Sequence, residues 1–378
     1  MDVIAPPATI GMLGGGQLGR YALVAARLMG YRTLVLDPDP SAPAGRVADE
    51  HLVAAYDDPA ALDRLAAECA AVTTEFENAP AAALERLAGD VVVAPAAGAV
   101  AIAQDRITEK GFLDDHGFST APWAPLVAVD DLAAAAAVGA PAIVKTARLG
   151  YDGKGQLAVD GAADLGAAWE RLGRAPCVVE RRVPLEVEVS VLVARRCSGE
   201  CAVYPVAENE HRNGILDLTV VPARIPAELA TDAVALAQAI AAALDYVGVL
   251  AVELFVSGGR LLVNELAPRP HNSGHWTLDG AVTGQFAQQI RAVTGAALGA
   301  TTMTVPAVAM VNLLGDLWPG EGEPDWSPVL AAADARLHLY GKVAARPGRK
   351  MGHLTILGAD RDEAAGRAVA LRAALGHR

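Results

Sequence analysis

Two glutamates lie in apolar, strand-like segments that a short turn separates. They are Glu253 and Glu265, and the turn between the segments is Ser257-Gly258-Gly259. A buried carboxylate costs free energy unless it is paired or bound to a metal. Carboxylate oxygens, with Asn264 beside them, suit a Mg²⁺ ion that also binds nucleotide phosphates. The pattern therefore predicts a magnesium site on adjacent strands, and the apolar flanks disfavour the alternative of an exposed strand face.

A glycine-rich loop with a lysine lies between two other strand-like segments. Residues 148–156 read Arg-Leu-Gly-Tyr-Asp-Gly-Lys-Gly-Gln, and Lys145 lies at the end of the strand before them. Glycine keeps such a loop flexible, while backbone N–H groups and Lys154 could offset phosphate charge. The loop does not match the G-x-x-x-x-G-K-[ST] pattern. We expect a flap over phosphate groups, with an ordinary hairpin turn as the alternative.

A glycine turn near the N-terminus is another candidate phosphate site. Gly14, Gly16 and Gly19 match G-x-G-x-x-G between a strand-like and a helix-like segment, and Asp37 ends the next predicted strand. The N–H groups at a helix N-terminus attract phosphate, and a dinucleotide fold places its ribose-binding acid near that strand end. A nicotinamide or flavin site is one interpretation, and a related fold that binds a different phosphate is the other.

Two further segments could bind an anionic substrate. Residues 269–276 follow the second carboxylate strand, and the spacing of His271 and His275 also permits zinc, although no further ligand set accompanies them. Residues 340–353 concentrate Lys and Arg, which suit a phosphate monoester. A solvated loop is the alternative for both segments. Glu180 and Glu188 could accept hydrogen bonds from a nucleotide, but each alone is more typical of a surface acid.

Composition narrows the class of protein. The chain of 378 residues has a net charge of −13 and four cysteines. This charge argues against nucleic-acid or anionic-membrane binding, and the cysteine spacing indicates reduced, mostly buried thiols. There is no basic segment followed by a long apolar one at the N-terminus, and the alanine-rich runs 132–142 and 231–244 are too short or too charged to span a bilayer. We expect a soluble cytoplasmic protein.

The order of the predicted elements indicates α/β and α+β regions. In residues 1–98, strands alternate with helices, which indicates parallel βαβ units. Residues 99–298 begin with a predicted helix near 101–116 and then contain much antiparallel strand. Residues 299–378 contain strands near 306–313, 336–339 and 353–357. The expected strands of the first region are 9–13, 33–37, 71–74 and 91–94, and its helices are 17–29, 59–69 and 80–88.

Seven segments, taken in order, resemble the N5-carboxyaminoimidazole ribonucleotide synthetase family. The resemblance runs from Gly11 to His353. The segments are GGGQLGR (14–20), TTEFEN (73–78), QDRITEK (104–110), GYDGKGQ (150–156), ENEHRNGIL (208–216), NELAPRPHNSGHWT (264–277) and YGK with RPGRKMGH (340–353). A dehydrogenase has no use for the later segments, so the resemblance displaces the dinucleotide interpretation.

The resemblance implies an ATP-grasp fold of three domains. These would be an N-terminal Rossmann-like domain (1–98), a central ATP-grasp domain (99–298) and a small C-terminal β-rich domain (299–378). It implies ATP and Mg²⁺ as cofactors, and a reaction of ATP, bicarbonate and 5-aminoimidazole ribonucleotide by way of carboxyphosphate, in purine biosynthesis. It also implies a homodimer.

The resemblance assigns a role to each candidate residue. ATP would be bound by Arg106, Lys145, Gly150, Gly153, Gly155, Gln156, Glu180, Val183, Glu188, His211 and Asn264. Magnesium would be bound by Glu253 and Glu265. Arg269 would stabilise the transferring phosphoryl group, and bicarbonate or the amine would be positioned by Tyr151, Asp152 and Lys154. The ribonucleotide would be bound by Gln17, Leu18, Glu75, His271, Asn272, Lys342, Arg349 and Lys350.

The segment after Glu180 departs from the family pattern. It reads Arg181-Arg182, where the family usually has an acidic and then an aromatic residue, so Glu186 is an alternative to Glu188. Two other functions stay open. One is a formate-dependent glycinamide ribonucleotide transformylase, which more often carries Asp in place of Asn272. The other is a non-catalytic nucleotide-binding regulator, against which the intact metal and phosphoryl residues argue.

Overall fold

The N-terminal region forms a five-stranded parallel sheet in the order β3-β2-β1-β4-β5. The structure is a computed structural model that describes residues 2–150, 153–320 and 322–376. The parallel βαβ prediction is confirmed, and the short strand β3 is an addition to it. The strands are β1 (Thr9–Leu13), β2 (Arg32–Leu36), β3 (Glu50–Leu52), β4 (Ala71–Thr74) and β5 (Val92–Val93). The helices are α1 (Gln17–Leu28), α2 (Pro59–Glu68) and α3 (Ala81–Leu87).

The helix predicted near 101–116 is two helices, α4 (Ala97–Gln104) and α5 (Arg106–Asp115). The chain breaks at Asp105, which has an extended backbone and whose carboxylate accepts the N–H of Ile107 at 3.0 Å. An aspartate in this position caps a new helix rather than continuing the old one. As a result, Arg106 becomes the first residue of α5.

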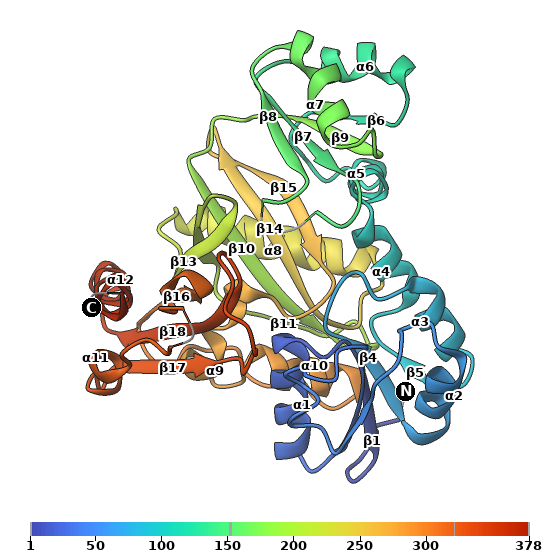
Figure 1. Ribbon diagram of the computed structural model, residues 1–378, viewed down its shortest axis with the longest axis vertical. Coiled ribbons are helices and arrows are strands. Elements are labelled where there is room, and N and C mark those ends of the chain that lie inside the picture. Colours follow the sequence, from blue (N-terminus) through green and yellow to red (C-terminus); the bar gives the residue numbers. More distant parts are fainter. Residues whose placement is uncertain (1, 151–152, 321, 377–378) are drawn as a thin grey trace.

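A small antiparallel sheet, in the order β6-β9-β7-β8, stands apart from the N-terminal sheet at the top of Figure 1. We call it the lid sheet. The glycine-rich loop follows its strand β7 and precedes β8, as predicted. The lid sheet comprises β6 (Trp123–Leu126), β7 (Ala142–Thr146), β8 (Gln156–Val159) and β9 (Cys177–Arg181), with helices α6 (Leu132–Ala137) and α7 (Leu165–Arg171).

The largest sheet has nine strands and crosses the middle of the molecule. Its order is β15-β14-β10-β12-β13-β16-β18-β17, with β11 paired to β10. The strands near the C-terminus thus continue the central sheet across β13 and β16. The strands are β10 (Val187–Arg195), β11 (Cys201–Val203), β12 (Ala207–Arg212), β13 (Ile215–Val221), β14 (Gly248–Ser257), β15 (Arg260–Ala267), β16 (Ala307–Leu314), β17 (Ala335–Leu339) and β18 (Lys350–Gly358). The helices of this part are α8 (Ala227–Ala243), α9 (Thr277–Gly280), α10 (Gln285–Val293), α11 (Ser327–Leu330) and α12 (Arg361–Leu375).

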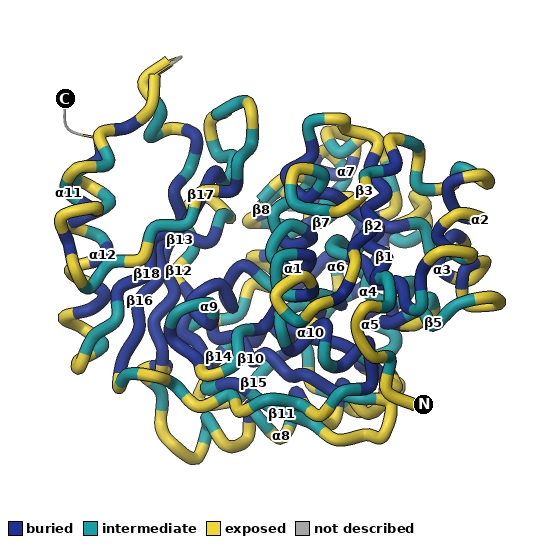
Figure 2. Tube along the Cα trace, turned by 90° about the horizontal axis from the view of Figure 1, so that it is seen from below, coloured by how far each residue is buried: buried dark blue, intermediate teal, exposed yellow. Residues whose placement is uncertain are grey.

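Helix α10 joins the central sheet to the N-terminal region. Its residues Phe286, Ile290 and Val293 pack in one core with Ile10 and Leu23 of the N-terminal sheet and α1. Figure 2 shows the strands as mostly buried tubes, with the exposed residues on the outer helices and loops. The regions are therefore held together by a shared apolar core.

Four cysteines are free. Cys69 and Cys177 are buried, but Cys197 is exposed and Cys201 is partly exposed, so the expectation of burial holds for two of them. None of the described helices is long and apolar enough to cross a membrane.

A largely buried cluster of aromatic rings lies between helix α1 and the central sheet. The rings of His275 and His353 are 4.9 Å apart, and His338 stacks on His353 at 4.6 Å. Tyr21 of α1 contacts this group, and the hydroxyl of Tyr340 lies 3.0 Å from Nδ1 of His353. Burial lowers the pKa of both His275 and His353 well below the ordinary value.

We expect His275 and His353 to lower the stability of the protein as the pH drops below 6.5, the ordinary histidine value. Both histidines stay neutral in the folded state, whereas the unfolded chain takes up protons below that pH. Each histidine then costs about 1.4 kcal/mol of unfolding free energy per pH unit, and neither contributes a pH dependence above it. Urea denaturation at a series of pH values measures this slope.

The His275→Gln and His353→Gln variants should each flatten the slope below pH 6.5. The matched control is His116→Gln, because His116 is exposed at the end of α5. An equal slope in all three variants and the parent protein would contradict the view that His275 and His353 cause the loss of stability below pH 6.5.

Candidate active site

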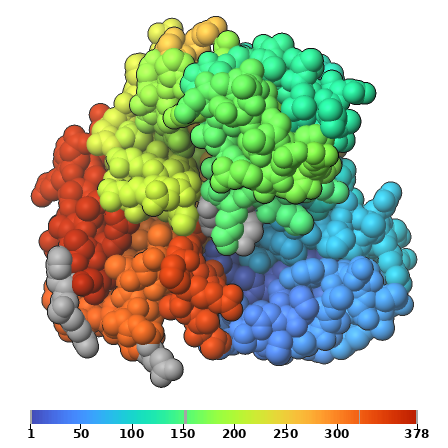
Figure 3. Space-filling model, turned by 45° about the horizontal axis from the view of Figure 1, so that its top comes forward, coloured from blue at the N-terminus to red at the C-terminus, as the bar shows by residue number. Residues whose placement is uncertain are grey.

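A cavity of about 740 Å³ lies between the N-terminal sheet, the lid sheet and the central sheet. Figure 3 shows the molecule hollowed where the green and yellow-green parts meet the blue and orange parts. Fifteen residues predicted from the sequence line it. They are Gln17, Leu18, Glu75, Arg106, Gly150, Lys154, His211, Glu253, Glu265, Arg269, His271, Asn272, Lys342, Arg349 and Lys350.

The remaining predicted residues fall into two groups. Tyr151 and Asp152 are outside the described residues. Among the described residues, eight that were predicted for ATP binding, three of them in the flap, are not among the residues that line the cavity. These are Lys145, Gly153, Gly155, Gln156, Glu180, Val183, Glu188 and Asn264.

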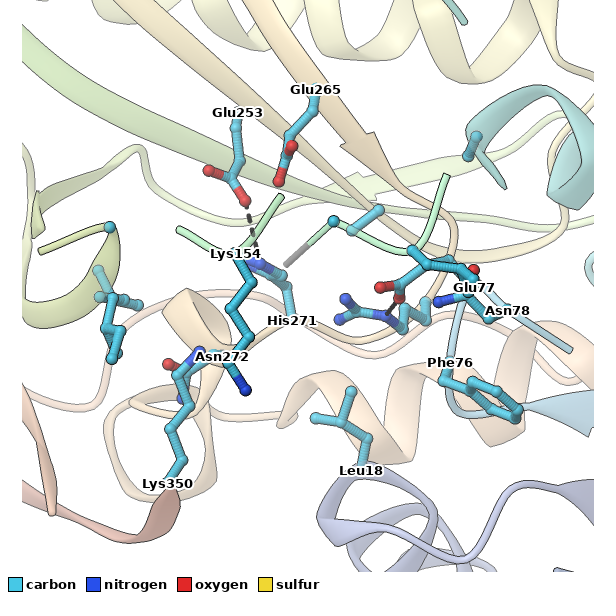
Figure 4. A pocket seen from close by; sticks show the side chains of 18 of the residues that line it. Leu18, Phe76, Glu77, Asn78, Lys154, Glu253, Glu265, His271, Asn272 and Lys350 are labelled. Carbon is cyan, nitrogen blue, oxygen red and sulfur yellow. Dashed lines mark hydrogen bonds and ion pairs between the residues drawn. The ribbon is translucent and has the colours of Figure 1, made fainter. Parts of the chain in front are cut away.

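Glu253 and Glu265 lie directly opposite each other on β14 and β15. The register skips Asn264, which is the extra residue of a β-bulge, and bulges re-aim the side chains beside them. Both carboxylates point into the same side of the cavity (Figure 4). The pair therefore has the placement that the sequence predicts for a metal site.

Each carboxylate of this pair has its own cationic or polar partner. Arg106 Nη1 donates to Glu265 Oε2 at 2.7 Å, and His271 Nε2 lies 3.1 Å from Glu253 Oε1. Burial alone would raise the pKa of Glu265, but Arg106 and Lys145 outweigh it and hold the pKa below its ordinary value. Mg²⁺ is usually bound by one or two carboxylates together with substrate phosphates, so these residues fit a magnesium ion.

The two histidines considered for zinc do not converge. His271 faces Glu253, whereas His275 packs in the buried ring cluster. The described part of the chain holds no group of three His, Cys, Asp or Glu side chains that could bind a metal. Zinc therefore has no support from the geometry.

Lys145 contacts two acceptors beside the cavity. Its Nζ lies 3.0 Å from Glu180 Oε2 and 3.5 Å from Asn264 Oδ1. Burial would raise the pKa of Glu180, but the ammonium groups of Lys145 and Lys110 outweigh it and lower that pKa. Glu180 is thus a buried, paired carboxylate rather than the surface acid considered from the sequence.

His211 and Glu188 form an ion pair between the neighbouring strands β12 and β10. Nδ1 of His211 lies 2.5 Å from Glu188 Oε2. Burial opposes a charge on His211, but Glu188 outweighs it, so the pKa of the imidazole is raised. This pairing brings together two residues that the resemblance assigns to the nucleotide.

The glycine turn is occupied by carboxylates of the protein itself. Glu75 accepts the N–H groups of Gly16 at 2.8 Å, Gly19 at 3.0 Å and Leu18 at 3.1 Å. Asp37 accepts the N–H of Gly15 at 2.6 Å. These are donors that a pyrophosphate would need at this turn, so the geometry disfavours a dinucleotide here.

Arg269 is paired with Glu77, a residue that the sequence analysis missed. Its Nε donates to Glu77 Oε2, so the guanidinium contacts the segment that follows β4. Burial opposes the charge of Arg269, but Glu77 outweighs it and raises the pKa of the guanidinium. The sequence signal for Glu77 was its place in the TTEFEN segment (73–78), two positions after Glu75, although the resemblance assigned it no role.

Asn272 is held by a reciprocal pair of amides. Its Nδ2 donates to Asn312 Oδ1 at 3.0 Å, and Asn312 Nδ2 donates back to Asn272 Oδ1 at 2.7 Å. Asn312 also donates to the carbonyl of Leu216 at 2.7 Å. An aspartate at position 272 would lack the N–H donor of this pair.

Basic residues near the C-terminus line the opposite side of the cavity. Lys342 Nζ donates to the carbonyl of Lys350 at 2.7 Å and lies 5.5 Å from the ring of Tyr340. Arg349 Nη1 donates to the carbonyl of Ala344 at 2.8 Å. Lys154 extends from the flap into the space between the carboxylate pair and Leu18 (Figure 4). The cavity thus has acids on one side and several cations on the other.

The glycines of the flap are required by close contacts. Gly153 and Gly155 have φ angles of +76° and +71°, which favour glycine. A Cβ on Gly153 would lie 2.8 Å from the carbonyl oxygen of Asn213. The flap therefore lies against the turn between β12 and β13, and Arg106 Nη2 also contacts the carbonyl of Gly150 at 3.3 Å.

Comparison with known proteins accounts for this arrangement. The model of the ribonucleotide synthetase preATP-grasp domain matches residues 7–104, that of the ATP-grasp domain matches 111–286, and that of the phosphoribosylaminoimidazole carboxylase C-terminal domain matches 308–367. The N5-carboxyaminoimidazole ribonucleotide synthase of Brucella melitensis is 47% identical over 359 residues, which are 93% of this chain and 97% of that protein. The chain belongs to the N5-carboxyaminoimidazole ribonucleotide synthase family.

Solved structures of this synthase family share the fold over nearly the whole chain. The Staphylococcus aureus N5-carboxyaminoimidazole synthetase complexed with ADP has a TM-score of 0.91 and 36% identity, covering 98% of this chain and 99% of that one. The Aspergillus clavatus synthase in complex with ADP and 5-aminoimidazole ribonucleotide has a TM-score of 0.88 and 30% identity, covering 97% and 98%. The predicted ATP-grasp fold and family are confirmed.

We expect Glu75 to stabilise the folded protein by accepting the N–H groups of the glycine turn. Replacing Glu75 by alanine leaves three backbone N–H groups without their charged acceptor and should lower the unfolding free energy by about 2 kcal/mol. Glu75→Gln keeps one acceptor oxygen and should lose less. Denaturant unfolding measures both.

The matched control is Glu85→Ala, an exposed acid on α3. It should leave stability unchanged. Binding of NADH to the parent protein, followed by its fluorescence, would contradict the view that the turn is already filled.

Proposed function

We propose that the protein uses ATP to join bicarbonate to the exocyclic amine of 5-aminoimidazole ribonucleotide, giving N5-carboxyaminoimidazole ribonucleotide, ADP and phosphate. Membership of the synthase family supports this activity. The observation that carries it to this chain is the shared cavity, in which the carboxylate pair faces a basic wall from the C-terminal region. ATP-dependent ligation needs both the carboxylate pair and the basic wall, because the nucleotide and the phosphorylated substrate must meet in one enclosed space.

The reaction has two steps. An oxygen of bicarbonate attacks the γ-phosphorus of ATP, which breaks the bond to ADP and forms carboxyphosphate. The amine nitrogen then attacks the carboxyl carbon of carboxyphosphate, phosphate leaves with the electrons of the C–O bond, and the amine loses a proton. In the alternative route, carboxyphosphate first breaks into CO₂ and phosphate, with its carboxyl proton passing to phosphate, and the amine then attacks the carbon of CO₂ and loses a proton. Carboxyphosphate hydrolyses readily, so a flap over the cavity would serve to exclude water.

The acidic side of the cavity would bind the nucleotide's phosphates. Glu253 and Glu265 would hold Mg²⁺, which supplies positive charge to phosphate oxygens when bound. Arg106 and Lys145, with the flap, would contact the phosphates, and Arg269 would stabilise charge on the transferring phosphoryl group. Glu180, Val183, Glu188 and His211 would bind the nucleoside.

The basic side of the cavity would bind the ribonucleotide. Lys342, Arg349 and Lys350 would hold its phosphate monoester, and Gln17, Leu18, Glu75, His271 and Asn272 would contact the remainder. Tyr151, Asp152 and Lys154 would position bicarbonate or the amine. By the same family relation we propose the domain bounds 1–98, 99–298 and 299–378, and a homodimer in the cytoplasm.

Phosphate release from ATP, Mg²⁺ and bicarbonate should be strongly stimulated by 5-aminoimidazole ribonucleotide. Its amine consumes the activated carboxyl group and so draws the reaction forward. A coupled assay of phosphate measures the rate, and Glu265→Ala should abolish the stimulation.

Glycinamide ribonucleotide with formate is the matched control substrate pair. Stimulation by this pair alone would assign the protein to the transformylase activity. Absence of ATP turnover with either pair would leave only a nucleotide-binding role.

Replacing Glu253 or Glu265 by glutamine should raise the Mg²⁺ concentration needed for half-maximal phosphate release. We expect a rate loss of roughly 100-fold, because an amide is a weaker ligand for a hard cation. A chelator should abolish the activity of the parent protein, and added Mg²⁺ should restore it.

Glu228→Gln is the matched control, since Glu228 is exposed on α8. It should keep the magnesium dependence of the parent protein. An unchanged dependence in both active-site variants would place the metal elsewhere.

A further inference from the structure

Lys110 is a buried cation that the proposed reaction does not use. It lies on α5, four residues after Arg106, and its side chain is 1% exposed. Its Nζ donates to the carbonyl of Asn264 at 2.9 Å and to that of Val263 at 3.4 Å. A lysine is almost never fully buried without partners, so this placement needs a reason.

Lys110 lies at the joint between the lid sheet and the central sheet. Its helix is fixed to β15 a second time, because Glu109 accepts the N–H of Leu266 at 2.6 Å. On the other side, Lys110 Nζ lies 3.6 Å from Glu180 Oε1 at the end of β9 in the lid sheet. One ammonium group therefore connects α5, β9 and β15.

Glu180 is shared by two lysines. Its Oε1 faces Lys110 of α5, and its Oε2 lies 3.0 Å from Lys145 of β7. The Glu180 side chain is 5% exposed, so water contributes little to its solvation. Removing the partner of a buried charge is strongly destabilising, and the carboxylate therefore attracts both ammonium groups strongly.

Lys145 is the more exposed of the two lysines, at 12% against 1%, and it is the one assigned above to the phosphates of ATP. It also lies 3.5 Å from Asn264 Oδ1, next to the carboxylate pair of the cavity. To contact a phosphate, Lys145 must share or give up its contact with Glu180. Glu180 and the phosphates thus compete for one ammonium group, and the outcome depends on what else compensates Glu180.

We propose that Lys110 is a positioning residue that compensates Glu180 and so releases Lys145 to the phosphates of ATP. This rests on the proposed function only in its use of ATP. Lys110 itself keeps its contact with Glu180, because its ammonium group is also bound to two carbonyl groups of β15. Without Lys110, Glu180 would depend on Lys145 and would retain it.

The test compares the affinities of the protein for ATP and for adenosine, which has no phosphate. Competition against a fluorescent ATP analogue measures both, without bicarbonate or imidazole, so a failure of the carboxylation activity would not affect it. Lys110→Met should raise the dissociation constant for ATP roughly tenfold. The dissociation constant for adenosine should stay within about twofold of that of the parent protein. Lys110→Arg should restore most of the ATP affinity.

A second substitution separates this role from a structural one. Glu180→Gln removes the charge that holds Lys145, so adding Lys110→Met to it should cause no further loss in the ratio of ATP to adenosine affinity. In this double variant the carboxylate and the ammonium group are removed together, so neither is left buried without its partner. The double variant should therefore fold even if Lys110→Met alone does not. Thr108→Met, an exposed change on the same helix, is the matched control and should bind both ligands normally.

Three results would overturn the proposal. One is an equal loss of ATP and adenosine affinity in Lys110→Met, which would show that Lys110 only supports the purine end. Another is no loss of either affinity. The third is a lower ratio of ATP to adenosine affinity in the double variant than in Glu180→Gln alone.

Discussion

Two carboxylates that face each other across neighbouring strands set the central constraint of this molecule. Glu253 and Glu265 are in register on β14 and β15, and like charges at that spacing are destabilising unless they are compensated. Arg106 and His271 supply the compensation from two different directions. Much of the surrounding architecture serves to bring these partners in: the break at Asp105 starts α5 at Arg106, and the loop after β15 returns His271 toward Glu253.

The same principle extends from the carboxylate pair toward the lid sheet. Glu180 is buried between Lys145 and Lys110, and Asn264 links this group to β15 through its carbonyl and its side chain. Burial strengthens each of these contacts because the local dielectric constant is low. Charge compensation therefore joins two sheets that share no strand, and it does so beside the residues assigned to ATP.

The fold follows largely from local patterns. The strands and helices near the N-terminus were predicted close to their observed bounds, and the strand pair β14 and β15 was predicted on either side of the turn 257–259. The predicted helix near 101–116 was wrong as a single element, because the capping strength of Asp105 outweighed the helical pattern around it. Strand β12, in which every residue from Glu208 to Arg212 is polar or charged, was not predicted, since its pairing depends on neighbours that are distant in sequence.

The sequence by itself determined the family, the fold class and fifteen of the residues that line the cavity, because motif order and residue type are local properties of the chain. The tertiary structure alone decided which of these residues meet. It showed that Glu75 fills the glycine turn, that Glu77 holds Arg269 and that Lys110 shares Glu180 with Lys145. These pairings join positions far apart in the chain, and the free energy of a buried charge depends on the partner that folding places beside it rather than on its sequence neighbours.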